Sequence, residues 1–589
     1  IHSIFLYSSE KAIQTICTAV KRMMKRRNYP KLYLVLLLLM LSKCDCRDNN
    51  ILRRDARDLA EADEKDNSTD VGFVQFGSDI DGDEINDRLG SAVAINHDGS
   101  RIAVGAYGSQ YDQGHVRIFQ YYHNIDENSN GIQIKNFNDD DRHNPIDIVE
   151  GINVENLRES NSIKLLLGRG QWIQLGSDLE GGIMNAQHGK AISMSLDGSR
   201  IAIGSPGEKR YTYYGASRVF QYDETSKEWV QLGNDDDCMI GDSLDDKSGE
   251  SLALSGDGKR LAIGAAFLSN TRNGYVKIYE FNEVQLKWIQ LGNLIYGDGY
   301  YDYMGQDIAM NDSGSRLVVG KGLSTVLNTL FAGEVVVYEY DDSGPESFWK
   351  QLGSSLEGTA YYDVFGDSVD ISGDGGRIIL GVPNGDEWGL DRGFARVYEY
   401  NAVEEDWFRL GINDLPGEKG GNGAGISVSI DTQGTRVIVG TRNRDSEEST
   451  KVAHSTMFEY NSNEDRWMQV GNRIAAECDN DGNDGEVALS GDGQRVIIGA
   501  PENIEYRGHA RVFQAVNGID DYAIPDNCQS HKPTVAPSTG PTVTSHPTVI
   551  NLTLDKDYSS GGAKMSRGVI VAITFGGIGV ASLVLYFSM

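Results

Sequence analysis

Short runs of apolar and polar residues alternate along most of this chain, and turns rich in glycine separate them. The clearest example covers residues 249–264, GESLALSGDGKRLAIG, in which two apolar stretches flank an Asp-Gly turn. Alternation with a period of two, interrupted by such a turn, predicts a β-hairpin. The pattern therefore favours an all-β protein built from hairpins.

The same hairpin recurs seven times in phase. Its opening glycine stands at Gly90, Gly189, Gly249, Gly305, Gly366, Gly425 and Gly485. Its closing glycine stands at Gly105, Gly204, Gly264, Gly320, Gly381, Gly440 and Gly499. An arginine precedes each closing glycine by four positions, at Arg101, Arg200, Arg260, Arg316, Arg377, Arg436 and Arg495. Because the arginine keeps one strand position in every copy, we expect it to bond a turn or a neighbouring strand rather than a substrate.

Two more strands accompany each hairpin. A third strand follows it, of the type Gly-x-x-Arg-Val-Phe/Tyr, as in residues 215–220. A strand led by tryptophan comes next, as in Trp229-Val-Gln-Leu-Gly, and its first copy is Phe73-Val-Gln-Phe-Gly. Four short strands in about 60 residues, repeated seven times, predict a seven-bladed β-propeller with four-stranded blades.

The order of the strands predicts how the ring closes. If the tryptophan strand is the outermost strand of each blade, the copy at Phe73 has no blade before it, and the seventh blade, which ends near Gln514, lacks an outer strand. We therefore expect the N-terminal strand to complete the last blade. The propeller then covers residues 71–515, and residues 121–170 form an insertion in blade one.

Two known families share parts of this repeat. The pattern Ser-x-Asp-Gly-x-Arg-Leu-Ala-x-Gly resembles the inner hairpin of WD-repeat propellers. The ends Gly204-Ser-Pro and Gly499-Ala-Pro, with their acidic loops, resemble the FG-GAP repeats of integrin-α-like ectodomains. The resemblance covers about residues 72–515 and implies the propeller fold. No WD dipeptide ends the third strand and the FG-GAP calcium loop is missing, so it implies no calcium site of that family.

The flanking segments indicate a cell-surface protein. Residues 1–46 read as a signal peptide region, because basic residues precede an apolar run at 32–41 that is too short to cross a bilayer. Residues 47–70 are a charged, disordered lead-in, and residues 516–567 form a Pro/Thr/Ser-rich stalk. Residues 568–587 carry no charge and fit a transmembrane helix, or a GPI signal removed near residues 559–563. Sequons at Asn67, Asn311 and Asn551 are candidate glycosylation sites.

The charge balance narrows the range of partners. The chain has 54 basic and 86 acidic residues, for a net charge of −32. Such a surface argues against nucleic acid as a partner and suits extracellular exposure, cationic ligands or bound cations.

The strand directions give the propeller two unlike faces. The outer-to-inner loops and the loops after each closing glycine share one face, which we call the long-loop face. The tight Asp-Gly turns, the insertion and both termini share the other. The long loops are acidic and aromatic, a combination that suits protein or carbohydrate ligands. Candidate ligand-binding residues are Tyr300, Tyr301, Asp302, Tyr303, Tyr361, Tyr362, Asp363 and Trp388.

Two acidic runs in long loops are candidate calcium sites, because closely spaced carboxylates around a turn glycine supply the oxygen ligands that calcium prefers. The alternative is that these acids only solvate the loops. The candidate ligands are Asp79, Asp81, Asp83, Asp87, Asp479, Asp481 and Asp484.

The favoured function is therefore recognition or adhesion by a membrane-anchored extracellular propeller, with a protein or a polysaccharide as ligand. The sequence has no zinc-ligand spacing, no phosphate-binding loop and no evident nucleophile-base pair, so an enzyme is less expected. A glycan-active enzyme using paired carboxylates remains the alternative. A structural surface component is the third possibility.

Overall fold

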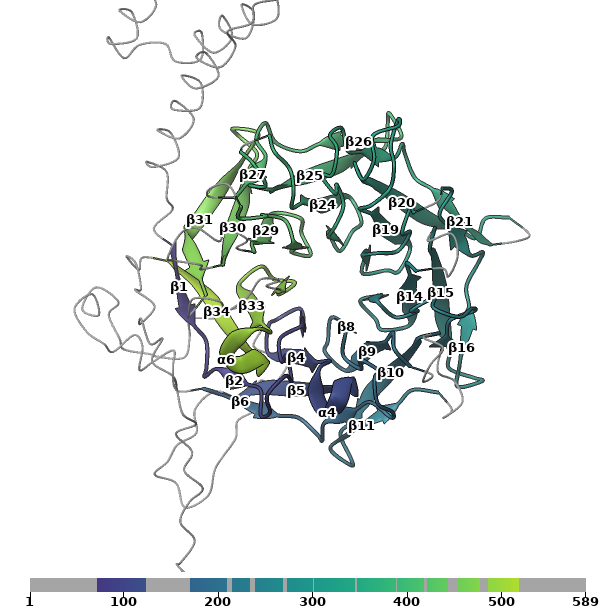
Figure 1. Cartoon of the computed structure of the whole chain (residues 1–589), viewed down its shortest axis with the longest axis vertical. Coiled ribbons are helices and arrows are strands. Elements are labelled where there is room, and N and C mark those ends of the chain that lie inside the picture. The colour runs from purple at the N-terminus through teal and green to yellow at the C-terminus, as the bar shows by residue number, and fades with distance from the viewer. Residues whose placement is uncertain are drawn as a thin grey trace, which may run out of the picture. The chain divides into compact units, whose positions relative to one another are not determined.

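A computed structural model describes eleven stretches of the chain. They are residues 71–122, 170–208, 214–233, 239–267, 273–299, 301–344, 347–387, 389–417, 421–442, 453–476 and 486–517. All of them belong to the first of the two units into which the chain divides, residues 1–530. They form seven antiparallel sheets arranged as a ring of blades, a seven-bladed β-propeller (Figure 1). The prediction of fold class is confirmed.

Each blade contains a path of four antiparallel strands, from the inner to the outer edge. Blade one has β3 (Ala92–Ile95), β4 (Arg101–Ala106), β5 (His115–Tyr122) and β6 (Gln171–Gln174). Blade two has β8 (Ala191–Met194), β9 (Arg200–Ser205), β10 (Ala216–Asp223) and β11 (Glu228–Gln231). Blade three has β13 (Ser251–Leu254), β14 (Arg260–Ala265), β15 (Tyr275–Asn282) and β16 (Lys287–Gln290). Blade four has β18 (Ile308–Met310), β19 (Arg316–Lys321), β20 (Glu334–Asp341) and β21 (Phe348–Gln351).

The remaining blades follow the same order. Blade five has β23 (Val369–Ile371), β24 (Arg377–Val382), β25 (Phe394–Asn401) and β26 (Asp406–Arg409). Blade six has β28 (Ser427–Ile430), β29 (Arg436–Gly440), β30 (His454–Asn461) and β31 (Arg466–Ala475). Blade seven has β32 (Val487–Leu489), β33 (Arg495–Ala500), β34 (His509–Asn517) and β1 (Val71–Gln75). Single-turn helices α4 (Ser109–Asp112) and α6 (Asn503–Tyr506) follow the closing glycines of blades one and seven.

The N-terminal strand closes the ring, as the strand order predicts. β1 pairs antiparallel with β34, from Val71 opposite Asn517 to Gln75 opposite Phe513. The third strand of blade seven thus lies between β33 and β1. The insertion predicted at 121–170 joins β5 to β6, and residues 123–169 lie outside the described part of the chain.

Six blades carry a fifth, two-residue strand that the repeat pattern does not reveal. A glycine with positive φ, such as Gly292 at 74°, turns the chain after the outer strand. The next two paired residues then form a short strand beside the start of the third strand. These strands are β2 (Ile80–Asp81), β7 (Leu179–Glu180), β12 (Met239–Ile240), β17 (Ile295–Tyr296), β22 (Leu356–Glu357) and β27 (Leu415–Pro416). In blade six β31 is continuous instead, with a register shift between Ser455 and Met457.

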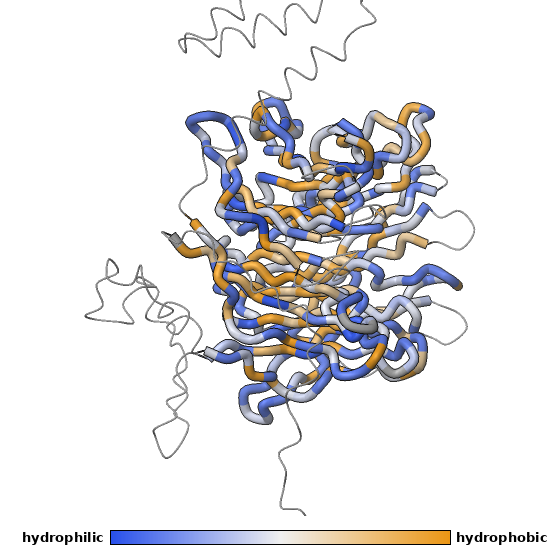
Figure 2. The backbone as a smooth tube through the Cα atoms, turned by 60° about the vertical axis from the view of Figure 1, so that its left-hand side comes forward, coloured by the Kyte–Doolittle hydropathy of each residue, from blue (hydrophilic) through white to orange (hydrophobic). Residues whose placement is uncertain are grey.

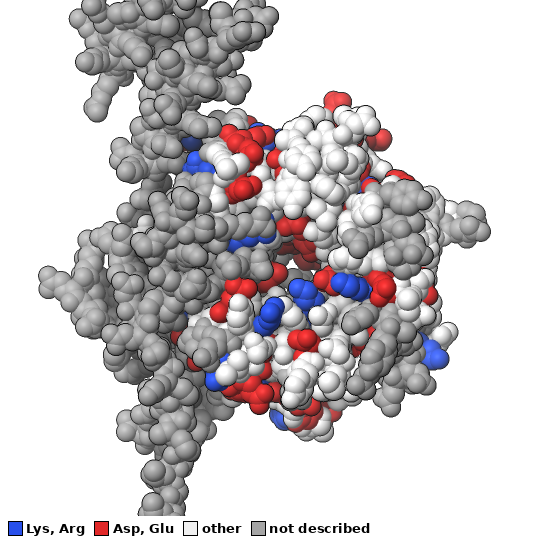
Figure 3. All heavy atoms as spheres, viewed as in Figure 1, with Lys and Arg blue, Asp and Glu red and all other residues white. Residues whose placement is uncertain are grey.

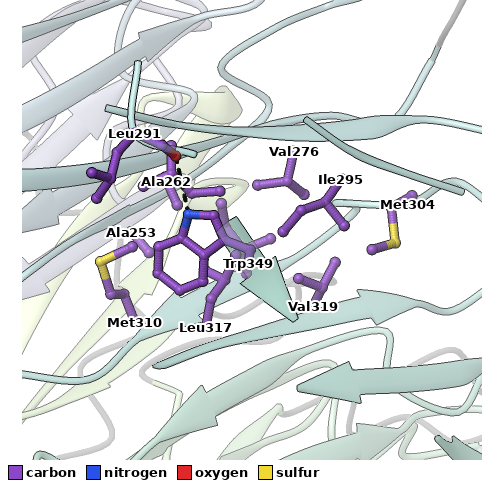
Figure 4. Close-up of a cluster of buried hydrophobic side chains, with 12 residues drawn as sticks. Ala253, Ala262, Val276, Leu291, Ile295, Met304, Met310, Leu317, Val319 and Trp349 are labelled. Carbon is purple, nitrogen blue, oxygen red and sulfur yellow. Dashed lines mark hydrogen bonds between the residues drawn. The ribbon is translucent and has the colours of Figure 1, made fainter. Parts of the chain in front are cut away.

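The core consists of apolar layers between adjacent blades. Figure 2 shows hydrophobic segments running through the strands and mostly hydrophilic residues in the loops. One layer between blades three and four contains Ile295, Leu317 and Val319 around Trp349 (Figure 4). Its indole N–H donates to the carbonyl oxygen of Leu291 in the preceding blade. The same bond, of 2.8–3.1 Å, joins Trp172 to Phe76, Trp229 to Leu175, Trp288 to Leu232, Trp407 to Leu352 and Trp467 to Leu410.

The repeated arginines form a second set of links between blades, on the tight-turn face. Arg316 Nη1 donates to the carbonyl oxygen of Gly375 in the turn of the next blade at 3.0 Å, and its guanidinium lies over the Tyr400 ring. Arg495 closes the circle by donating to the Asp98 carbonyl oxygen of blade one. The matching bonds run from Arg101 to Gly198, Arg200 to Gly258, Arg260 to Gly314, Arg377 to Gly434 and Arg436 to Gly493. The predicted structural role of the arginines is confirmed.

Among the described residues, none of the helices is long and apolar enough to cross a membrane. The predicted signal region at 1–46, the lead-in at 47–70, the membrane segment at 568–587 and almost all of the stalk at 516–567 lie outside those residues.

Candidate functional site

The long-loop face is built from one loop geometry that recurs at the blade junctions. In the loop that enters each of blades one to six, the residues four and two positions before the opening glycine have positive φ; in blade five these are Tyr362 at 65° and Val364 at 58°. Such conformations are strained for residues other than glycine and persist only where surrounding contacts impose them. Here the Tyr362 and Val364 N–H groups donate to the carbonyl oxygens of Leu330 and Phe331 in blade four. Similar pairs of bonds hold the loops that enter blades one, two and six to the preceding blade, so in the described residues these loops are fixed in pairs.

A buried aspartate closes several of these loops, three positions before the opening glycine. Asp302 Oδ2 accepts the Gly299 N–H at 2.6 Å, and Asp87 and Asp246 accept the N–H groups of Glu84 and Ser243 in the same way. The Asp302 residue is only 6% exposed and also lies 3.4 Å from the Lys321 ammonium. The predicted ligand group Asp302 and the predicted metal ligand Asp87 are thus engaged inside the loop.

Asp363 occupies the same position in blade five and is also buried. Burial, together with the nearby charges of Asp386 and Glu387, raises the pKa of its carboxyl group to about 6. Tyr303 is buried as well, with its ring edge-on to Phe267 at 5.4 Å. The structure therefore removes three of the predicted ligand-binding side chains, Asp302, Tyr303 and Asp363, from the open surface.

Other predicted ligand-binding side chains do face solvent. Tyr361 is 68% exposed, and Tyr301 and Tyr362 are about half exposed. Tyr300 and Trp388 lie outside the described residues.

Several apolar side chains lie at the junction of blades four and five, beside Tyr361 and Tyr362. The loop after the closing glycine of blade four brings Leu327, 84% exposed, and Leu330 to the same junction, where the Phe331 ring packs edge-on against Tyr362 at 5.9 Å. We call Leu327, Leu330, Phe331, Tyr361 and Tyr362 the apolar loop patch. Sequence reasoning found its tyrosines but missed Leu327, Leu330 and Phe331.

A repeated signal for such exposed tips exists in the sequence. The position five before the opening glycine holds a large apolar residue in four further loops, at Ile85, Met184, Leu244 and Tyr300. The first three are exposed, and Tyr300 lies outside the described residues.

The acidic run at 79–87 does not assemble into a metal site in the described structure. Asp83 pairs with the Arg117 guanidinium, which also binds Asp178 at 3.1 Å. Asp79 accepts a hydrogen bond from the Gln75 amide, and the Asp81 residue is exposed. Within the described stretches, no three His, Cys, Asp or Glu side chains are placed to hold one ion. Asp479, Asp481 and Asp484 lie outside these stretches, and calcium binding stays a prediction.

Two carboxylates at the inner edge of the ring accept hydrogen bonds from the backbone of the neighbouring blade. Asp307 Oδ2 accepts the Val369 N–H of the next blade at 2.8 Å, and Asp370 Oδ2 accepts the Ile430 N–H likewise. Burial away from water, together with the nearby Glu486 charge, raises the pKa of the Asp307 carboxyl group to about 8. Burial likewise raises the pKa of the Asp370 carboxyl group to about 6. These carboxylates satisfy backbone groups at the inner edges of neighbouring sheets. Figure 3 shows acidic side chains beside the central opening.

The sequon at Asn311 lies in the tight turn of blade four. The Asn311 residue is 3% exposed, and its Oδ1 accepts the N–H groups of Ser315 and Arg316. Its amide nitrogen donates to the Ser313 hydroxyl. A glycan on this nitrogen would disrupt the turn, so we expect Asn311 to be unmodified in the folded protein. Asn67 and Asn551 lie outside the described residues.

No protein-family model matches this chain, and no curated protein matches it. Similar solved structures include a hydrazine synthase chain from Kuenenia stuttgartiensis, at 11% identity and a TM-score of 0.39, covering 75% of this chain and 98% of that one. A putative 6-phosphogluconolactonase from Bacteroides uniformis has 10% identity and a TM-score of 0.39, covering 66% and 85%. A periplasmic gluconolactonase from Pseudomonas aeruginosa has 13% identity and a TM-score of 0.37, covering 59% and 92%. At this level of likeness they bear on neither ligand nor reaction.

Proposed function

We propose that this protein is a membrane-anchored, extracellular recognition or adhesion protein that binds a protein or polysaccharide through its long-loop face. The observation that carries the proposal is the apolar loop patch. Large apolar side chains that gather on a surface in contact with water are unusual in monomeric proteins and mark sites of interaction. In this patch Leu327 and Tyr361 are more than two-thirds exposed.

The rigidity of the patch supports a binding role. Hydrogen bonds between the loops of blades four and five fix the backbone of Leu330, Phe331 and Tyr362. A surface that is ordered before binding loses less conformational freedom in the complex, so more of the contact energy appears as affinity. Tyrosine adds a flat apolar face with a polar tip, which suits both protein and sugar partners.

The flanking sequences supply the proposed cellular context. The apolar runs at 32–41 and 568–587, with the Pro/Thr/Ser-rich segment between the propeller and the second run, support secretion and tethering. The inner hairpins resemble those of WD-repeat propellers and the Gly-Ser-Pro and Gly-Ala-Pro ends resemble FG-GAP repeats, which fits an ectodomain. Release of the protein from cells by a phosphatidylinositol-specific phospholipase would indicate a lipid anchor, and retention would indicate a helix.

The test is binding of the full-length protein, purified in detergent, to a panel of glycans and extracellular-matrix proteins, with calcium and with EDTA. We expect saturable binding that the double substitution Tyr361→Ala and Tyr362→Ala weakens at least about tenfold. Phe408→Ala is the matched control, because Phe408 is an exposed aromatic residue on the outer strand β26, away from the patch. Loss of binding in EDTA would support calcium in the acidic loops.

Two results would contradict this function. Release of product from a glycan would favour the alternative of a glycan-active enzyme. Absence of saturable binding to every member of the panel would favour a structural surface component.

A further inference from the structure

A second site stands out on the long-loop face, where blades seven, one and two meet. Arg88, in the loop that enters blade one, places its guanidinium carbon over two tyrosine rings, 5.4 Å from the centroid of Tyr107 and 5.4 Å from that of Tyr506. One guanidinium N–H donates to the Tyr107 hydroxyl. Lys190 of blade two brings its ammonium to 5.0 Å from the centroid of the same Tyr107 ring. We call these four residues the cation–tyrosine cluster.

The two cations of the cluster have no acidic partner in the part of the chain that the structure describes. Within the described residues, no Asp or Glu oxygen lies within 4.0 Å of the Arg88 or Lys190 nitrogens. This is unexpected in a chain with 86 acidic residues. Three other cations near this face are neutralised: Arg218 pairs with Glu208, Lys277 with Asp242 and Arg396 with Asp414. Lys247, at the position equivalent to Arg88, instead lies 4.1 Å from the centroid of a single ring, that of Phe267.

The cluster is also held in place. Arg88 has a positive φ of 57°, its N–H donates to the Tyr506 carbonyl oxygen at 2.8 Å, and the following Leu89 N–H donates to the Arg507 carbonyl oxygen. The backbone therefore fixes the origin of the side chain, and the two rings restrict its plane. Two positive charges beside one ring raise the local positive potential, and a bound anion would offset their mutual repulsion.

We propose that the cation–tyrosine cluster binds the carboxylate of an acidic sugar, such as a uronic acid residue of a polysaccharide. A guanidinium with one donor used by Tyr107 retains four, in the planar fork that matches a carboxylate, and Lys190 adds a point charge. Tyr506 is partly exposed and Tyr111, in the neighbouring helix α4, is strongly exposed, so both offer ring faces on which a sugar can pack.

Charge favours a singly charged group over a multiply charged one. The protein as a whole carries a net charge of −32, and only charges within about a Debye length, 8–10 Å, act strongly on a bound group. A carboxylate group, with one charge, gains the local attraction of two cations, whereas a phosphate group, with nearly two charges at neutral pH, meets more of the surrounding repulsion. Figure 3 shows basic side chains beside the central opening among acidic ones. This inference rests on the proposed recognition function and names a ligand class for a second part of the same face.

The experiment measures binding of full-length protein to galacturonic acid oligomers, to neutral galactose oligomers of equal length and to inorganic phosphate. We expect saturable binding of the acidic oligomer only, weakened by added salt. Arg88→Gln and Lys190→Gln should each reduce affinity about tenfold or more. Lys259→Gln is the charge-matched control, since Lys259 lies in a tight turn on the opposite face and pairs with Glu283; its affinity should equal that of the parent.

Specific outcomes would overturn the inference. Equal binding of acidic and neutral oligomers, or unchanged affinity in Lys190→Gln, would exclude the cluster as a carboxylate site. Competition by phosphate as effective as that by the uronic acid would exclude a sugar-specific site. Lys190→Gln changes one partly exposed side chain, so the test holds even if Arg88→Gln does not fold.

The two proposals fail separately. Loss of acidic-sugar binding with the Tyr361/Tyr362-dependent binding intact would overturn only this inference. Acidic-sugar binding that survives Tyr361→Ala and Tyr362→Ala, with no other ligand found on the panel, would support the cluster and contradict the apolar loop patch as a binding surface.

Discussion

The indole N–H of Trp349 in blade four donates a 3.1 Å hydrogen bond to the carbonyl oxygen of Leu291 in blade three. Its ring also covers Gly292, where a Cβ would lie only 3.0 Å from the Trp349 Cδ1 atom. Six blade junctions carry this tryptophan bond. At the junction of blades six and seven, Phe73 takes the place of the tryptophan, and its side chain has no N–H to donate.

Replacing Trp349 by phenylalanine should therefore weaken the junction of blades three and four. The substitution keeps an aromatic ring but leaves a buried carbonyl oxygen without its donor, at a cost of about 1–2 kcal/mol. Thermal denaturation followed by circular dichroism should show a lower midpoint. Phe408→Leu, at an exposed position, should leave the midpoint nearly unchanged, and an equal effect of the two substitutions would contradict the role of the bond.

Replacing a buried loop aspartate should lower the stability of the protein, whereas replacing an exposed loop tyrosine should not. Asp302→Ala removes the acceptor of the Gly299 N–H and one of the two carboxylates near the buried Lys321 ammonium, so it should destabilise the protein by about 1–3 kcal/mol. Tyr301→Ala, one position earlier on the exposed side, should change stability by less than about 0.5 kcal/mol. Comparison of the two melting curves tests the distinction. If Asp302→Ala were as stable as the parent protein, the structural role would be contradicted and Asp302 would again be a candidate ligand-binding residue.

Asp307 should make stability decrease with rising pH. Its folded pKa is raised from 3.8 to about 8, so between these values the folded state binds a proton that the unfolded state has lost. The favourable contribution is present at low pH and is lost as the pH rises toward 8, by up to about 1.4 kcal/mol per unit. Asp307→Ser introduces the residue found at the equivalent Ser251 and Ser368, and it should flatten the fall in melting temperature between pH 5 and 8. An identical slope in both proteins would contradict the assigned shift.

His188 should make stability decrease as the pH falls, the opposite of the effect of Asp307. Burial lowers its pKa from 6.5 to about 3, and its Nδ1 shares a 2.7 Å hydrogen bond with the Ser205 hydroxyl. Below pH 6.5 the unfolded chain binds a proton that the folded chain does not, so stability is lost as the pH falls toward 3. His188→Met introduces the residue found at the equivalent Met304, and its melting temperature should fall less than that of the parent between pH 7 and 4.5. A steeper fall in the variant would exclude this explanation.

The ring could be predicted because its determinants repeat. A strand, a turn and an arginine that recur in phase define the hairpin, and the unpaired outer strand at Phe73 defines the closure with β34. The partner of each arginine could be predicted only as a class of contact. The accepting turn lies 54–59 residues away for five of the arginines, 97 away for Arg101 and 397 away for Arg495, and its distance in space does not follow from such spacings. The second, short strand pairing after Gly292 depends on one positive φ, which the sequence does not distinguish from an ordinary turn.

The candidate site was predicted less well, because side-chain direction in loops does not follow from composition. Asp302 and Tyr301 are neighbours in an acidic, aromatic loop, yet one closes the loop from inside and the other faces solvent. The recurrence of aspartate three positions before the opening glycine, at Asp87, Asp246 and Asp302, was the available signal of a structural role. Leu330 and Tyr362 come together only when two loops from different blades fold against each other, and no local sequence pattern predicts that contact.

The pairing of Val71 with Asn517 also determines how the ring responds to mechanical load. These residues form one end of the β1–β34 ladder, so forces that separate the two ends of the propeller would break its hydrogen bonds one at a time, beginning there. A force between the chain after Asn517 and a ligand on the long-loop face acts along β34 instead. Because β34 lies between β33 and β1, such a force loads both ladders in shear, and many bonds resist it together. A tethered propeller would thus withstand pulling by its ligand far better than pulling by its own termini.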